Sequence, residues 1–430
     1  MTKPLCTLAI LAVTGPGVVQ AADGYANING LTIGGASGPV VIVSNRIDFA
    51  TYVRTNIPYT VLVEGTIVTN SITPRSNKSI IGIGTNAAFI GRLNISVQAS
   101  NIVVRNLFIS NPGTTTSSDG ITIDDSSHHI WVDHCTFSDC GDGQVDITGA
   151  ADFVTVSWCK FSYVDQSSHR FSNLIGASDT ATNDAGKLRV TFHHNWWGTL
   201  CTERMPRVRF GRVHVYNNYY NAPGNNYCTA ASIQSEVLVE KNFFENVDEP
   251  YRYQSPAGLL RAVSNITVNC TGVGVFNDSV FTPPYTYTLD AAADVPGIVT
   301  NAAGAGKLGF DGAPFQLWQL NSFGCILCPQ AAVDADPDGD GQDNMTEYLA
   351  GTDPTNAAST FRVINIENTG DTVTLAWPTA PGRTNIVEAA AEAAGGYSNV
   401  SPDIFTTGTS TNFSLTTNAP NLYYRIKILP

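Results

Sequence analysis

The sequence is poor in charge, and above all in positive charge. Charged residues make up 14% of the chain, with only 23 Lys and Arg against 36 Asp and Glu among 430 residues. The resulting formal net charge of -13 repels nucleic-acid phosphates and anionic membranes, so we expect neither as a partner. We expect a monomer.

Long apolar runs are also missing. The run "LCTLAILAV" at 5–13 is too short to span a membrane. Lys3 precedes it and "VQAA" at 19–22 offers a cleavage site, so residues 1–22 are predicted to be a secretory signal peptide. The alternative, a buried N-terminal strand, is disfavoured by Pro16. We therefore expect an exported protein. Whether it is released, periplasmic or held at the cell surface stays open.

Cysteine is present in modest number, and export decides its state. Cys6 leaves with the signal peptide, and eight cysteines remain in an oxidising compartment. Cys325 and Cys328 form a C-x-x-C without the βαβ context of a redox motif. We interpret this pair as a local disulfide or as two free thiols.

What the chain does have is a repeat. Six segments align, and they are "VVRNLFI" (103–109), "WVDHCTF" (131–137), "TVSWCKF" (155–161), "TFHHNWW" (191–197), "HVYNNYY" (214–220) and "LVEKNFF" (238–244). One column holds Leu107, Cys135, Cys159, Asn195, Asn218 and Asn242, and two places on come Ile109, Phe137, Phe161, Trp197, Tyr220 and Phe244. Successive units are 23 to 28 residues apart, except for one step of 36 between Cys159 and Asn195, which must hold a loop.

Strand repeats of this length without helices indicate a solenoid. A parallel β-helix fits best, because coils stacked about 4.8 Å apart turn equal positions into ladders. We expect Asn195, Asn218 and Asn242 to hydrogen-bond from coil to coil, beside a stack of aromatic rings. Leucine-rich repeats share the period but not the pattern. The predicted fold is all-β, with a parallel β-helix over 23–322.

The chain changes character near residue 325. We expect a linker at 323–333, an acidic loop at 334–356 and a small antiparallel β-sandwich-like module at 357–430, where "TVTLAW" and "NLYYRIKI" alternate weakly.

A cluster of arginines contrasts with the general shortage of positive charge. Arg204, Arg207, Arg209 and Arg212 fall within nine positions. Pro206 predicts that Arg204 lies on a loop before a strand, and Arg207 and Arg209 share one strand face. The simpler interpretation is a run of solvent-exposed charges with no binding role. Forked guanidinium groups on one wall favour instead an anionic ligand that carries carboxylates.

Three aspartates are predicted to meet near this wall. "DGQVD" places Asp142 and Asp146 four residues apart, and Asp119 lies one coil earlier. Each alone is typical of a turn, but three converging carboxylates call for a hard cation. His134, His193 and His194 lie within repeat rows, so we interpret them as structural.

Several segments resemble pectate lyases of polysaccharide lyase family 1. They are "SNKSIIGIG" (76–84), "DGITIDDSSHHIWVDHCTFSDC" (119–140), "DGQVDIT" (142–148), "VTFHHNWWGTLCTERMPRVRFGRVHVYNNYY" (190–220) and "DAAADVPGIVTNAAGAG" (290–306). The resemblance covers about 24–310 and implies a right-handed parallel β-helix.

The resemblance also implies roles for individual residues. Arg204 matches the family's catalytic base and Arg209 its second arginine, and we expect Arg209 and Arg207 to bind substrate. Asp119, Asp142 and Asp146 match its Ca²⁺ ligands. The family's further acidic ligand is replaced by Ser117, which implies weaker calcium binding. The family's substrate-binding lysine is replaced by Phe171, and the neighbouring Arg170 is a candidate substitute.

A second calcium loop is predicted far from the arginines. Asp336, Asp338, Asp340, Gln342 and Glu347 occupy positions 1, 3, 5, 7 and 12 of an EF-hand-type loop, with Gly341 at 6 and Asn344 at 9. It resembles the calcium repeats of dockerin or thrombospondin type 3 modules, and a short helix at 343–350 should follow. The plainer alternative is an acidic linker.

The resemblance implies calcium-dependent β-elimination of polygalacturonate to 4,5-unsaturated oligogalacturonides, with Arg204 taking the C5 proton. Because a free arginine has a pKa above about 12, we expect activity at alkaline pH.

A pectin lyase acting on methylated chains without calcium is disfavoured by the three aspartates. A hydrolase needs a carboxylate pair, whereas Asp124 and Asp125 are adjacent and point to opposite faces of a strand. A non-catalytic glycan-binding β-helix is a further alternative, because Phe171 stands where the family has its substrate-binding lysine.

Overall fold

The computed structural model describes residues 22–113, 118–164, 169–323, 326, 328–417 and 422–429. The chain forms two compact units, Met1–Gly312 and Ala313–Pro430. The domain boundary predicted after residue 322 falls inside helix α3 (Pro314–Phe323), which belongs to the second unit. Apart from Ala22, the predicted signal peptide lies outside the described residues. No helix in the described part of the chain is long and apolar enough to cross a bilayer.

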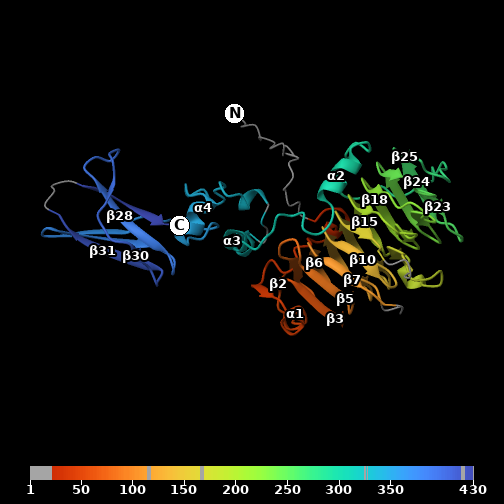
Figure 1. Ribbon diagram of the computed structural model, residues 1–430, viewed down its shortest axis with the longest axis horizontal. Helices are drawn as coiled ribbons and strands as arrows, with labels where there is room; N and C mark the ends of the chain where they lie inside the picture. The colour runs from red at the N-terminus through yellow and green to blue at the C-terminus, as the bar shows by residue number, and fades with distance from the viewer. Residues whose placement is uncertain are drawn as a thin grey trace, which may run out of the picture. The chain divides into compact units, whose positions relative to one another are not determined.

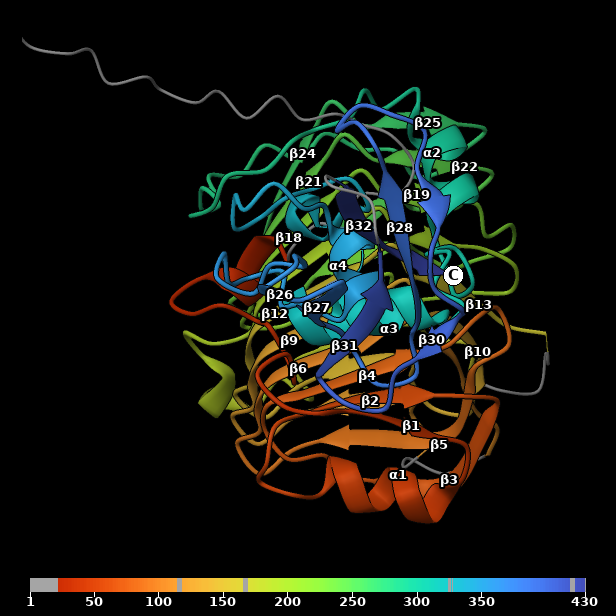
Figure 2. The same ribbon diagram turned by 90° about the vertical axis from the view of Figure 1, so that its left-hand side faces the viewer.

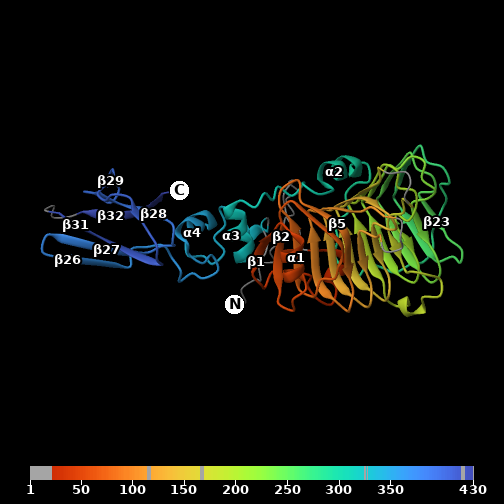
Figure 3. The ribbon, with the colours of Figure 1, turned by 60° about the horizontal axis from the view of Figure 1, so that its bottom comes forward.

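The first unit is a parallel β-solenoid, as the repeat predicts. Its strands stack from the red β2 to the green β23 (Figures 1 and 3). Among the described residues, one sheet holds ten strands. In stacking order they are β1 (Val40–Val43), β2 (Tyr59–Val63), β4 (Lys78–Gly82), β6 (Ser100–Arg105), β9 (His128–Asp133), β12 (Asp152–Ser157), β15 (Arg189–His193), β18 (Arg212–Tyr216), β21 (Glu236–Glu240) and β24 (Leu259–Val263).

A second sheet consists of two runs that meet at β5 (Ala88–Ile95), which also pairs with β3 (Thr66–Ile72). One run is β8 (Ile121–Ile123), β11 (Val145–Ile147), β14 (Leu174–Ile175), β17 (Arg207–Val208), β20 (Thr229–Ala231) and β23 (Tyr251–Tyr253). The other is β7 (Phe108–Asn111), β10 (Thr136–Cys140), β13 (Lys160–Ser162), β16 (Trp196–Trp197), β19 (Tyr219–Tyr220), β22 (Phe243–Glu245) and β25 (Ile266–Val268). The first of these runs carries the predicted site.

Both predicted ladders are confirmed. Asn195 Nδ2 donates to Asn218 Oδ1 (3.0 Å), Asn218 to Asn242 (2.9 Å) and Asn242 to Asn265 (3.0 Å), so the ladder gains one coil beyond the prediction. The stacked rings are Phe137, Phe161, Trp197, Tyr220 and Phe244, with successive centroids 4.3 to 5.2 Å apart. The buried amides are therefore satisfied by their own copies in the next coil, which fixes the register of the solenoid.

Two histidines of the repeat lie where each coil turns, directly before a ladder residue. His134, Trp158 and His194 each precede a ladder residue and have φ values of 48, 50 and 53°, in the left-handed region that lets the coil turn. Their rings stack, with Trp158 lying 5.7 Å from His134 and 4.2 Å from His194. His193 contacts Asp23 at 2.7 Å. The structural interpretation of these histidines thus has a physical basis in the fold.

Short helices accompany the solenoid. They are η1 (Gly24–Asn27), α1 (Arg46–Val53), η2 (Thr182–Asp184) and α2 (Val295–Ala302). The Asn45 side chain caps α1 by accepting from the amides of Ile47 and Asp48. Phe49 and Val53 of α1 are buried in the main core, so this helix covers the red N-terminal coils (Figure 2).

The second unit holds α3, η3 (Pro329–Ala331), α4 (Asn344–Ala350) and an antiparallel β module, as predicted. One sheet is β26 (Asn365–Thr369), β27 (Thr372–Pro378) and β31 (Ser410–Thr416), and the other is β28 (Thr384–Ala390), β29 (Ser398–Asn399), β30 (Ile404–Phe405) and β32 (Tyr423–Leu429). Leu375, Trp377 and Val387 form the core of the module. Asp343 caps the predicted short helix α4, and Gly351 ends it at φ 76°.

Among the described residues, every cysteine except Cys328 is unbonded. Cys135, Cys140, Cys159, Cys201, Cys228 and Cys270 are free thiols. Cys328 is disulfide-bonded, whereas Cys325, the other half of the C-x-x-C, lies outside the described residues.

Candidate active site

Two buried carboxylates lie on neighbouring coils. Asp119 precedes β8 and Asp146 lies within β11, whose register pairs Asp146 with Thr122. Asp119 accepts from Thr122 Oγ1 (2.7 Å) and the Gly143 amide (3.0 Å), and Asp146 accepts from the Leu174 amide (3.1 Å). They are 5% and 8% exposed. The parallel register therefore brings these two predicted ligands to one wall.

No ion pair among the described residues balances the charge of either carboxylate. Burial raises the pKa of Asp146 well above its usual range, and the nearby charge of Asp119 raises it further, while Arg204 lowers it. Burial also raises the pKa of Asp119, with a smaller contribution from Asp142. In the described part of the chain neither Asp119 nor Asp146 forms an ion pair. Asp142 is more exposed and lies 3.5 Å from His169 Nδ1.

The residues present fit a hard cation. Two buried anionic side chains with raised pKa values need a positive charge to remain ionised. A Cβ on Gly143 would lie 2.3 Å from Asp146 Oδ1, so glycine keeps this space open. Among the described residues, the carboxylate oxygens of Asp119, Asp142 and Asp146 do not all lie within 4.8 Å of one another. Ser117, where the family has a further acid, lies outside the described residues.

Arg204 and Arg207 line the same wall. Arg204 precedes β17, as predicted, and has φ 61°. Its Cζ lies 4.4 Å from the centroid of the Phe171 ring. Arg207 is on β17, between β14 and β20, and burial together with the charges of Arg209 and Arg204 lowers its pKa. The Nε atoms of both arginines are buried without a hydrogen-bond partner in the described structure.

Arg209 is held by the protein itself. Its Nε donates to Asp179 Oδ1 (2.6 Å) and its Nη1 to the carbonyl of Gly176 (2.9 Å), and the residue is 8% exposed. Gly176 has φ 82°, and a Cβ there would lie 2.9 Å from that of Arg209. Arg209 thus fixes the turn after β14, and its predicted contact with substrate stays a prediction.

Arg170 lies next to this wall. Its carbonyl accepts from the amide of Thr202 (2.9 Å), and its φ is 57°. Its Nε is buried and unpartnered among the described residues. The replacement of the family's lysine by Arg170 therefore stays a prediction.

Sequence reasoning missed the groups that orient the arginines. Phe171 forms an isolated parallel bridge with Glu203, which places it beside Arg204, and Asp179 holds Arg209. Arg252 is a further candidate for binding substrate. Arg207 pairs with Ala230, and Ala230 pairs with Arg252 on the same face of the sheet. Extending the repeat alignment beyond the six segments to β14 and β17 is the signal that pairs Phe171 with Arg204.

The second predicted metal site lies in the second unit. The carboxylate oxygens of Asp336, Asp338 and Asp340 lie within 4.8 Å of one another, and Glu347 is fully buried. The Gln342 side chain instead binds the backbone of Phe361. Gln342 can therefore offer a metal ion only its main-chain carbonyl.

Comparisons with known proteins identify the first unit. A family model described as pectate lyase matches residues 1–308. The chain belongs to the pectate lyase family. A pectate trisaccharide-lyase of Thermotoga sp. (strain RQ2) is 34% identical over 321 residues, covering 65% of this chain and 86% of that protein. A Bacillus licheniformis pectate trisaccharide-lyase is also 34% identical, over 306 residues, with 66% and 86% covered.

Solved pectate lyases share the fold. A mutant of the Bacillus subtilis enzyme has a TM-score of 0.59 at 26% identity and covers 69% of this chain and 100% of that chain. A Bacillus pectate lyase in complex with trigalacturonate has a TM-score of 0.58 at 29% identity, with 67% and 100% covered. The protein is therefore a polysaccharide lyase built on a parallel β-helix.

Proposed function

We propose that this pectate lyase is calcium-dependent and cleaves the α-1,4 bonds of polygalacturonate by β-elimination, giving 4,5-unsaturated oligogalacturonides. The observation that carries the proposal is the wall on which Asp119 and Asp146 lie, buried and unpaired among the described residues, near Arg204. A net-negative protein can hold a polyanion there only if a cation and the arginines offset the negative charge.

Asp119, Asp142 and Asp146 would hold Ca²⁺ together with a uronate carboxylate of the substrate. When bound, calcium supplies a Lewis acid that makes the C5 proton of that uronate more acidic. Arg207 and Arg170, whose Nε atoms are buried and unpartnered in the described structure, bind the carboxylates of neighbouring sugars. Arg209 positions the turn at Gly176.

Arg204 removes the C5 proton. The electron pair of the C5–H bond forms the C4–C5 double bond, the C4–O bond breaks, and the departing oxygen takes a proton from water. Phe171 lies under the guanidinium of Arg204 and limits the positions that the base can adopt.

The proposal is tested by the ultraviolet absorbance of the unsaturated product. Purified protein is incubated with polygalacturonate and with methylated pectin, each with calcium and with chelator. We expect product from polygalacturonate with calcium only. Product from methylated pectin in chelator would make the protein a pectin lyase, and binding without product would make it a glycan-binding protein.

We also propose that the enzyme is exported, on the strength of residues 1–22. Expression of the full chain in a bacterial host should yield lyase activity outside the cytoplasm and a mature N-terminus near Ala22. Retention of an uncleaved chain in the cytoplasm would contradict this.

A further inference from the structure

The acidic loop of the second unit plays no part in the lyase chemistry, yet it is built like a metal site. Asp336, Asp338 and Asp340 bring their carboxylate oxygens within 4.8 Å of one another. Asp336 accepts from the amides of Gly339 (2.8 Å) and Gly341 (2.9 Å), which curls the loop around its own carboxylates. An exposed acidic turn can take this form without an ion, so this geometry alone decides nothing.

The deciding observation is a buried carboxylate. Glu347 of α4 is 0% exposed. Its Oε1 accepts from Thr352 Oγ1 (3.2 Å), whereas its Oε2 has no hydrogen-bond partner in the described structure. A buried anion beside three others is costly unless a cation joins them.

Two carboxylate oxygens of the loop are also buried without a hydrogen-bond partner in the described structure. Asp338 Oδ2 and Asp340 Oδ2 are buried and have no partner among the described residues. The spacing of these acids matches a twelve-residue calcium loop, whose seventh position supplies its main-chain carbonyl and whose twelfth binds through both carboxylate oxygens. Carboxylate and carbonyl ligands at this spacing favour Ca²⁺ over transition metals.

We propose that residues 336–347 bind one Ca²⁺ through Asp336, Asp338, Asp340, the Gln342 carbonyl and Glu347, and that this ion stabilises the whole second unit. This proposal does not rest on the lyase mechanism.

The link to the β module is made by Gln342. Its Nε2 donates to the Phe361 carbonyl (2.8 Å), and its Oε1 accepts from the Phe361 amide (3.0 Å). Phe361 packs against the core around Leu375 and Trp377. The side chain at position 7 thus joins the metal loop to the β module, while its main chain is left for the ion.

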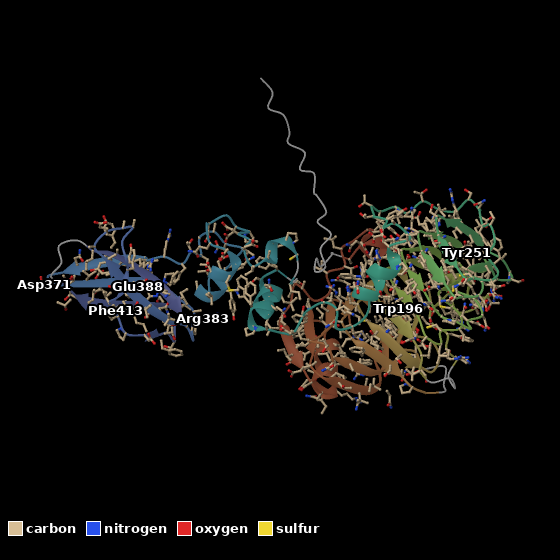
Figure 4. All side chains as sticks on the ribbon, turned by 45° about the horizontal axis from the view of Figure 1, so that its top comes forward. Trp196, Tyr251, Asp371, Arg383, Glu388 and Phe413 are labelled. Carbon is tan, nitrogen blue, oxygen red and sulfur yellow. The ribbon has the colours of Figure 1, made fainter. Side chains whose placement is uncertain are left out.

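A second link comes from the β module. Arg383, labelled in Figure 4, donates to the carbonyl of Tyr348 in α4 (2.7 Å), and its Cζ lies 4.9 Å from the Tyr348 ring. Because Tyr348 follows Glu347, an ion on Glu347 fixes the turn of helix that Arg383 binds. Calcium binding and folding of the module are therefore coupled.

The test is calorimetric melting of the full chain in chelator and in calcium. At calcium about 100-fold above the dissociation constant, we expect the transition of the second unit to rise by roughly 10 °C. Glu347→Gln keeps the side chain's size and should abolish most of that rise. Glu392→Gln, an exposed glutamate of the same unit, is the matched control and should behave as wild type.

A second variant tests the link. Gln342→Ala should bind calcium with an affinity within about twofold of wild type, because the ligand is a main-chain carbonyl, yet lose at least half of the melting shift. An unchanged shift in Gln342→Ala would overturn the coupling. The same shift in Glu347→Gln as in wild type, or an equal shift with magnesium, would overturn the calcium site. Polygalacturonate cleavage by the same samples is measured separately, so that failure of the lyase mechanism is seen on its own.

Discussion

The guanidinium carbon of Arg204 lies 4.4 Å from the centroid of the Phe171 ring. Phe171 occupies the position where the family resemblance implies a lysine. The exchange removes a positive charge but gives the predicted base an aromatic face to stack on. A cation over such a ring is stabilised by about 1 kcal/mol, which orients the protonated side chain and is given up when Arg204 loses its proton to act as the base.

Phe171→Ala should therefore lower kcat by roughly tenfold and leave KM within about twofold, because it loosens the base rather than a contact with substrate. Phe171→Tyr keeps the ring and should retain most of the activity. The control is Phe153→Ala, which removes the ring beside Arg189 outside the site. A rise in KM with unchanged kcat would mean that Phe171 binds sugar.

Asp146→Asn should separate function from stability. We expect turnover to fall by roughly 100-fold, equivalent to a few kcal/mol of lost electrostatic stabilisation, and extra calcium to restore part of it. In chelator the same variant should melt higher than wild type. The reason is that the folded-state pKa of Asp146 is raised, so its ionised form destabilises the fold at neutral pH.

The control for this experiment is Asp125→Asn, an exposed residue of the neighbouring turn, which should change neither property. A lower melting temperature for Asp146→Asn in chelator would show that the carboxylate stabilises the fold without calcium.

The ladders and the site differ in how far the sequence could predict them. Asn195, Asn218 and Asn242 repeat at one column, so their coil-to-coil bonds follow from spacing alone. Phe171 and Arg204 meet beside the isolated bridge between Phe171 and Glu203, which lies outside the six aligned segments, so the repeat as first aligned does not pair them. The loop positions of Asp336 to Glu347 were predictable from spacing, whereas the use of the Gln342 side chain depends on where Phe361 lies.

Arg170→Ala should raise KM by up to about tenfold with little change in kcat, if its guanidinium replaces the family's lysine, since such a contact is equal in the ground and transition states. Arg212→Ala removes a neighbouring arginine that pairs with Glu236 at the surface and serves as the control. Equal kinetic constants in Arg170→Ala and wild type would assign the substrate contacts to Arg207 and its neighbours.

The stability of the solenoid should fall in mild acid. His214 is fully buried and contacts Glu240 and Tyr285, each at 2.8 Å. Burial lowers the pKa of His214 below that of the unfolded chain, about 6.5. As pH falls below about 6.5, the unfolded state takes up the proton first and stability is lost.

Melting temperatures between pH 8 and pH 5 should therefore fall less steeply for His214→Gln than for wild type. His169→Gln, which changes an exposed histidine, should keep the wild-type slope. An identical slope in all three proteins would assign the acid sensitivity to other groups.

The most direct test of the account is the kinetics of Arg204→Lys. Lysine keeps the positive charge but is shorter and lacks the planar fork. If Arg204 takes the C5 proton, a shift of the basic atom by about 1 Å costs ~100-fold, and the loss falls on kcat while calcium and substrate binding are kept. A variant with near-normal kcat and a raised KM would contradict the account, because Arg204 would then bind substrate and another group would be the base.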